Sequence, residues 1–71
     1  MNLVGVKKMV VTAGELKRGD YIRHFTEERW KVLSIPTKIR RGMLRFQVLC
    51  LDSQQEKWVI FDARWRFTRE P

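Results

Sequence analysis

The sequence predicts an all-β fold, a small antiparallel barrel of five or six strands in which residues 1–71 form one domain. Several short segments alternate apolar and polar residues at period two, whereas no segment keeps apolar residues at helical spacing for three turns. The candidate strands start about ten residues apart and are separated by turn-forming residues. A barrel also leaves little open sheet edge, which suits so short a chain.

Each expected strand combines alternation with β-branched or aromatic residues. In chain order, strands are expected at residues 20–25, 30–35, 44–51, 57–61 and 64–68, with residues 7–12 as an optional sixth. Residues 44–51 form the strongest candidate, because Phe46, Val48 and Cys50 share one face and both faces become apolar towards its end. We therefore expect this strand to be central.

The connections are expected at residues 13–19, 26–29, 36–43, 52–56 and 62–63, which have lengths typical of links between antiparallel neighbours. Residues 13–17 are too short to form more than a turn. Residues 69–71 are expected to fray, as chain ends commonly do.

Aromatic side chains are expected to supply most of the core. A domain of this size removes only about 60% of its surface from water on folding, so its core must be dense. The aromatic residues are Tyr21, Phe25, Trp30, Phe46, Trp58, Phe61, Trp65 and Phe67. Trp30 and Trp58 are expected in the core first and as part of an exposed stacking platform second. Because Ile22 should face inward, Tyr21 and Phe25 either form an exposed stacking platform beside Arg23 or pack under a neighbouring loop.

The chain is strongly basic, with 15 Lys and Arg residues against 8 Asp and Glu residues and a formal net charge of +7. A field of this size favours nucleic acid, an acidic protein surface or anionic lipid as the partner. Cys50 is the single cysteine and cannot close an intramolecular disulfide, so we expect a cytoplasmic protein. Lys7 and Lys8 interrupt the apolar N-terminal stretch, and we expect neither a leader peptide nor a membrane span.

Residues 36–51 contain four cations, Lys38, Arg40, Arg41 and Arg45, and no carboxylate. The planar guanidinium group donates two parallel hydrogen bonds to an anion and stays charged at any relevant pH. This basic loop around Gly42 is therefore predicted to bind phosphates. The alternative is a solvated hairpin whose charges only maintain solubility.

A second basic cluster alternates with aromatic residues near the C-terminus. On a strand, Arg64 and Arg66 would share one face, and Trp65 and Phe67 the other. The alternative is an ordinary last strand with snorkelling arginines. Lys7 and Lys8 would extend this patch if the termini pair. The predicted nucleic-acid-binding residues are Lys38, Arg40, Arg41, Arg45, Arg64, Arg66, Arg23 and Tyr21.

Enzyme chemistry, metals and cofactors are not expected. His24, Cys50 and the scattered carboxylates of Asp20, Asp52 and Asp62 would have to meet to form a nucleophile and base. His24 is expected to be a half-buried structural residue, and Cys50 an inert core thiol. One cysteine and one histidine also cannot provide the four ligands of a closed zinc site.

The segment Glu15-Leu16-Lys17-Arg18-Gly19-Asp20-Tyr21-Ile22 resembles the opening of translation-type SH3-like barrels, in which Leu-x-x-Gly-Asp leads into the first strand. The layout over residues 12–67 is similar to the N-terminal domain of the elongation factor P family: Trp30 and Val32 follow, then a basic loop and a long strand. The resemblance implies a barrel with a cationic tip. Arg41 stands where that family has a modified lysine, and arginine cannot take that modification.

We therefore expect a non-enzymatic small barrel that binds RNA or DNA through phosphates with little base specificity. A different class of function stays open, namely a protein-interaction module that docks on an acidic protein through Tyr21, Phe25 or Trp65. Self-association is compatible with both. SH3-like barrels serve many functions, so the fold alone does not choose between them.

Overall fold

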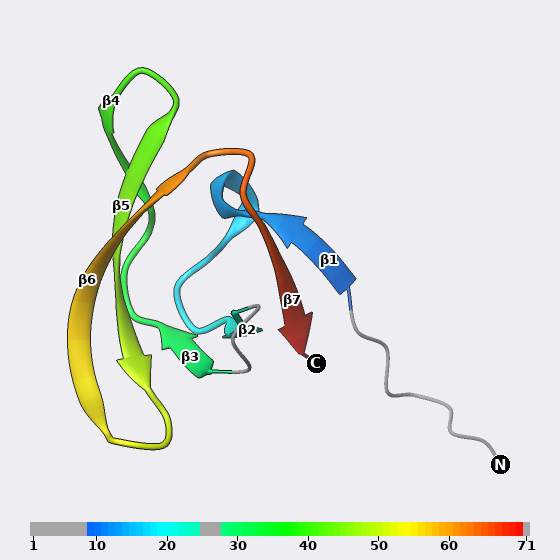
Figure 1. The fold of residues 1–71 in the computed structure, drawn as a ribbon, viewed down its shortest axis with the longest axis vertical. Coiled ribbons are helices and arrows are strands. Elements are labelled where there is room, and N and C mark those ends of the chain that lie inside the picture. Colours follow the sequence, from blue (N-terminus) through cyan, green and yellow to red (C-terminus); the bar gives the residue numbers. More distant parts are fainter. Residues whose placement is uncertain (1–8, 25–27, 71) are drawn as a thin grey trace, which may run out of the picture.

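The computed structural model describes residues 9–24 and 28–70, which form a seven-stranded antiparallel sheet curled into a half-barrel (Figure 1). The strands are β1 (Met9–Thr12), β2 (Tyr21–Arg23), β3 (Arg29–Val32), β4 (Thr37–Arg40), β5 (Met43–Cys50), β6 (Gln55–Asp62) and β7 (Arg66–Glu70), with one 3-10 turn, η1 (Ala13–Glu15). The all-β antiparallel fold predicted from alternation is confirmed. No helix in the described residues is long and apolar enough to cross a membrane.

Strand β5 is the centre of the sheet, as its two-sided apolar pattern predicts. The strand order is β1-β7-β2-β3-β5-β4, and β6 pairs with the other edge of β5. Strands β3 and β4 line one edge of β5 in succession, with Val32 opposite Val48 and Thr37 opposite Arg45. Every residue of β5 has a partner in β6. The part of β5 next to β4 therefore lies between β4 and β6, and the turn that joins β4 to β5 is at one end of the sheet (Figure 1).

Strand β7 lies between β1 and β2 and holds the two halves of the chain together. Val11 is opposite Phe67, and Ile22 is opposite Arg69. The expectation that residues 69–71 fray is wrong for Arg69 and Glu70, because both belong to β7. Their side chains also form ion pairs, Glu70 with Arg23 at 2.7 Å and Arg69 with Asp20 at 3.7 Å.

Strand β4 is the main correction to the predicted elements, because residues 36–43 were expected to form a loop. All four residues of β4 are exposed, so the segment has no apolar alternation for a sequence reading to detect. It becomes a strand because it pairs with the first half of β5. The described strand count is therefore seven rather than five or six.

The strand nearest the C-terminus begins at Arg66 rather than at residue 64. The Trp65 backbone N–H donates to the Asp62 carbonyl at 2.9 Å, so residues 62–65 form a turn before the strand. The predicted positions of Lys7, Lys8 and Phe25 lie outside the described residues.

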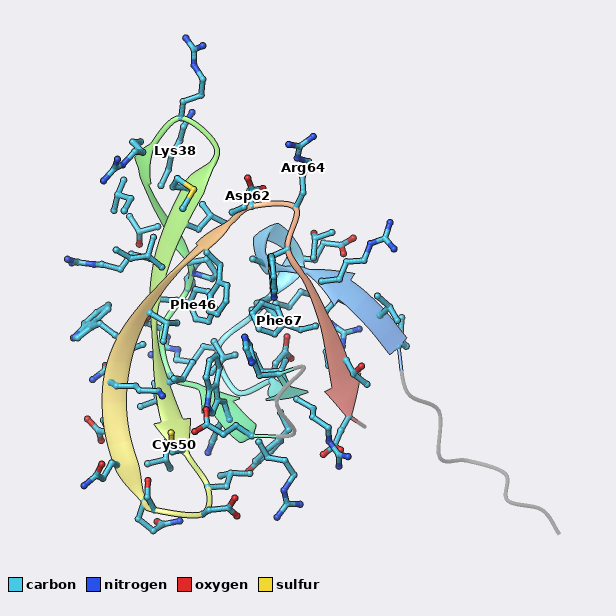
Figure 2. All side chains as sticks on the ribbon, in the orientation of Figure 1. Lys38, Phe46, Cys50, Asp62, Arg64 and Phe67 are labelled. Atoms are coloured by element: carbon cyan, nitrogen blue, oxygen red, sulfur yellow. The ribbon has the colours of Figure 1, made fainter. Side chains whose placement is uncertain are left out.

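The core lies in the concave side of the curled sheet, where Figure 2 shows Phe46 and Phe67. Its buried residues are Val11, Ala13, Leu16, Ile22, Trp30, Val32, Phe46, Val48, Cys50 and Phe67. Rings of Phe46, Phe61 and Phe67 meet with centroids 5.0–6.3 Å apart, in stacked and edge arrangements. Ile22, Trp30 and the Phe46 face of β5 thus face inward as predicted.

Trp58 is not in the core, which corrects the prediction made for it. Its exposed fraction is 55%, whereas Trp30 is 3% exposed. In β6 the inward positions belong to Val59 and Phe61, which lie opposite Phe46 and Leu44. Trp58 lies one position out of phase with them, opposite Gln47, and therefore on the convex face.

The turn between β4 and β5 depends on Gly42, whose φ is +73°. A Cβ there would meet no atom within 4 Å, so the cost of Gly42→Ala is conformational. We expect this change to lower the free energy of unfolding by about 1–2 kcal/mol, the cost of placing an L-residue in the left-handed region. Urea unfolding measures it. Gly14→Ala is the matched control, because Gly14 has no positive φ and its Cβ would make only an ordinary contact, 3.6 Å from the Ala63 carbonyl oxygen. Equal midpoints for the two variants would contradict the expected strain.

Candidate functional site

Four cations gather on the β4–β5 hairpin, and we call Lys38, Arg40, Arg41 and Arg45 the cationic tip. All four are exposed. None forms an ion pair with a carboxylate among the described residues, whereas Arg23, Lys57, Arg64 and Arg69 do. The hairpin carries no carboxylate of its own. The tip therefore presents uncompensated positive charge on a protruding element, where an extended anion can reach it.

The fold adds Arg64 to the same end of the molecule, although it is 23 positions from Arg41 in the sequence. The Ala63 N–H donates to the Gly42 carbonyl at 2.7 Å, and Asp62 lies opposite Met43. Figure 2 shows Lys38, Asp62 and Arg64 at one end of the sheet and Cys50 at the other. The two basic clusters that were predicted to bind phosphates can therefore contact one ligand together, because Arg64 lies at the same end of the sheet as the cationic tip.

Among the residues that the structure describes, Asp62 and Glu15 bring carboxylates near this end, and both are engaged within the protein. Asp62 Oδ1 accepts from the Arg64 backbone N–H at 2.8 Å and lies 3.6 Å from Arg64 Nε. The Arg64 side chain is nevertheless 92% exposed, so this pair contributes little to stability and leaves most of the guanidinium accessible. Glu15, the last residue of η1, accepts from the Thr12 backbone N–H at 2.8 Å and from its hydroxyl, and these hydrogen bonds lower the pKa of its carboxyl.

Arg23 and Tyr21 lie away from the cationic tip. Both are in β2, opposite Thr68 and Glu70 near the far end of β7. Arg23 donates to Glu70 at 2.7 Å, which gives it a structural role. Tyr21 is 40% exposed, and the Lys31 ammonium lies 5.7 Å from its ring centroid. The structure therefore divides the predicted binding residues between two regions.

Arg66 lies between these two regions. It opens β7 opposite Thr12 and is exposed. The two aromatic residues on either side of it differ in burial, since Phe67 is 2% exposed and Trp65 is 41% exposed. Trp65 precedes the strand and therefore does not follow the strand alternation. Together with Asp62 and Arg64 it lines a shallow depression.

Trp58 lies beside the cationic tip, although it is not among the predicted binding residues and a stacking platform was only the second expectation for it. The Arg45 guanidinium carbon lies 4.7 Å from the Trp58 ring centroid, within the range of a cation–π interaction. The sequence does contain a signal, because Trp58 and Ile60 alternate with Val59 and Phe61 and only one of these pairs can face the core. Sequence alone does not say which pair does.

His24 and Cys50 occupy structural positions. Cys50 is 9% exposed within the core cluster, so its predicted core position is confirmed. His24 is half-buried and stacks on Trp30 with centroids 5.2 Å apart. Burial lowers the pKa of its imidazole, with a further lowering by Lys57 and an opposing effect of Glu28. Among the described residues, no group of three or more His, Cys, Asp or Glu side chains could hold a metal ion.

No family model, curated protein or solved structure matches the chain. The resemblance to translation-type SH3-like barrels therefore stays a prediction made from the residues that carry it.

Proposed function

We propose that this protein is a non-enzymatic nucleic-acid-binding barrel that contacts the phosphate backbone through the cationic tip, assisted by Arg64. The observation that carries the proposal is the set of four exposed cations on one hairpin with no described carboxylate paired to them. Phosphate contacts hold a polyanion in position without reading its sequence. We therefore expect slight base specificity.

Other features agree with this class of function. The formal charge of +7 favours long-range attraction of a polyanion. Cys50 is buried and His24 is stacked among aromatic rings, so neither supports a catalytic role, and we propose a binding protein rather than an enzyme. A lone buried thiol is compatible with the cytoplasm, which we propose as the site of action. The SH3-like resemblance is compatible with RNA and with DNA.

The salt dependence of binding tests the proposal. If the four cations of the tip each neutralise one phosphate, affinity for a short oligonucleotide should fall on the order of a hundredfold between 50 and 200 mM salt. Fluorescence anisotropy at several salt concentrations measures the slope. Absence of binding at low salt, or tight binding without a salt slope, would remove the proposal.

Docking on an acidic protein is the second candidate, and one observation favours it. Tyr21 and Trp65 are exposed by 40% and 41%, as aromatic anchors of an interface would be. Phe25, the third expected anchor, lies outside the described residues. A pull-down with and without nuclease separates the candidates. A stoichiometric protein partner that survives nuclease treatment would favour docking, and a capture that nuclease abolishes would favour nucleic acid.

A further inference from the structure

The convex face of β4, β5 and β6 carries a large exposed aromatic ring. Trp58 is 55% exposed, and Ile60, two positions further along β6, is 50% exposed. Single exposed apolar residues are common and need no explanation by themselves. Trp58 differs because a cation of the tip, Arg45, is placed over its ring at 4.7 Å.

The strand register places this ring on the same face as two cations of the tip, Arg40 and Arg45, whereas Lys38 lies opposite Leu44 on the other side of a register shift in β4. Directly opposed residues of antiparallel strands share a face, and so do alternate residues of one strand. Arg40 lies opposite Met43, Arg45 lies opposite Ile60, and Trp58 lies opposite Gln47. Met43, Arg45 and Gln47 alternate along β5, so all three rows face the same way. Four residues of strand separate the first row from the third, about 14 Å.

The chemistry of this face matches an unpaired nucleotide strand. Cations bind phosphates, and an indole ring stacks on a base of any identity. In a duplex the faces of the bases are already covered by their neighbours, so only an unpaired base can lie on Trp58. The two carboxylates of β6 that share this face are engaged: Asp62, opposite Met43, pairs with Arg64, and Glu56, opposite Leu49, accepts from Gln47 at 3.2 Å. The face thus leaves positive charge beside the ring, which suits a polyanion better than an apolar protein surface.

Resting on the proposed function, we infer that this face binds single-stranded nucleic acid, with phosphates on the cationic tip and a base stacked on Trp58. Arg45 then has two roles, since its guanidinium supports the ring and also contacts the backbone. The ligand class becomes single-stranded RNA or DNA rather than duplex.

The experiment compares Trp58→Ala with wild-type protein on a single-stranded oligonucleotide and on its duplex, at 50 mM salt, by fluorescence anisotropy. Loss of one base–aromatic stack should weaken single-strand binding about 5- to 150-fold. Duplex binding should change by less than about twofold, because the phosphate contacts remain. Trp58→Phe should recover most of the affinity because it keeps a ring.

Ile60→Ala is the matched control, an exposed apolar residue on the same face, and it should leave both affinities unchanged. A wild-type protein that binds no nucleic acid would refute the proposed function itself. If the wild type binds both ligands but Trp58→Ala changes neither, or weakens both equally, the proposed function stands and the stacking inference is overturned.

Discussion

Phe46→Ala is expected to cost about 3–5 kcal/mol of unfolding free energy, the usual range for removing a buried aromatic ring. Phe46 is 0% exposed and contacts the rings of Phe61 and Phe67, with centroids 6.0 and 6.3 Å away. A small domain has a thin margin of stability, within about 5–15 kcal/mol for proteins in general. The thermal midpoint should therefore fall by at least about 12 °C, measured by circular dichroism.

Ile60→Ala provides the control for this comparison because Ile60 is 50% exposed on the convex face. It should cost less than about 1 kcal/mol, the span of strand propensities. Similar midpoints for Phe46→Ala and wild type would mean that β5 presents its other face to the core, and would invalidate the placement of Arg45 and Trp58 as well.

Arg40→Glu combined with Arg41→Glu should weaken nucleic-acid binding at least about 100-fold at 50 mM salt. Two hydrogen-bonded contacts to charged groups, each worth about 1.5–3 kcal/mol, would be lost, and two carboxylates would then repel the phosphates. The free energy of unfolding should be almost unchanged, since both side chains are exposed and neither pairs with a described carboxylate. Substitutions at such surface positions rarely change it by more than about 0.5 kcal/mol. Oligonucleotide titration and thermal unfolding measure the two quantities.

The control carries the same change of charge elsewhere. Arg18→Glu with Arg29→Glu reverses two exposed arginines away from the tip, and the Leu51 N–H donates to the Arg29 carbonyl at the opposite end of β5. This variant should lose only the long-range part of the attraction, so its affinity should fall much less. Equal losses in the two variants would indicate that net charge, rather than the hairpin, holds the ligand.

The strands of this protein could be predicted where burial imposes a pattern. Phe46, Val48 and Cys50 alternate because the core accepts every second side chain of β5, and this regularity is visible in the sequence. Strand β4 could not be predicted in that way, because all of its residues are exposed and its conformation comes from pairing with β5. The same limit explains why Arg69 and Glu70 were not expected to be ordered in a strand, because their pairing depends on strands far away in the sequence.

The candidate site was predictable in its charge and unpredictable in its geometry. The acid-free run of Lys38, Arg40, Arg41 and Arg45 is a property of the sequence. The addition of Arg64, the separation of Arg23 and the outward position of Trp58 depend on which strands become neighbours.

The sequence by itself determined an all-strand chain with a strongly basic segment, because period-two alternation and unbalanced charge are local properties of neighbouring residues. Only the tertiary structure decided which cations are neutralised and which face of β6 is turned to solvent. Those outcomes depend on the register between strands, and a shift of one residue would exchange Trp58 and Val59 between solvent and core.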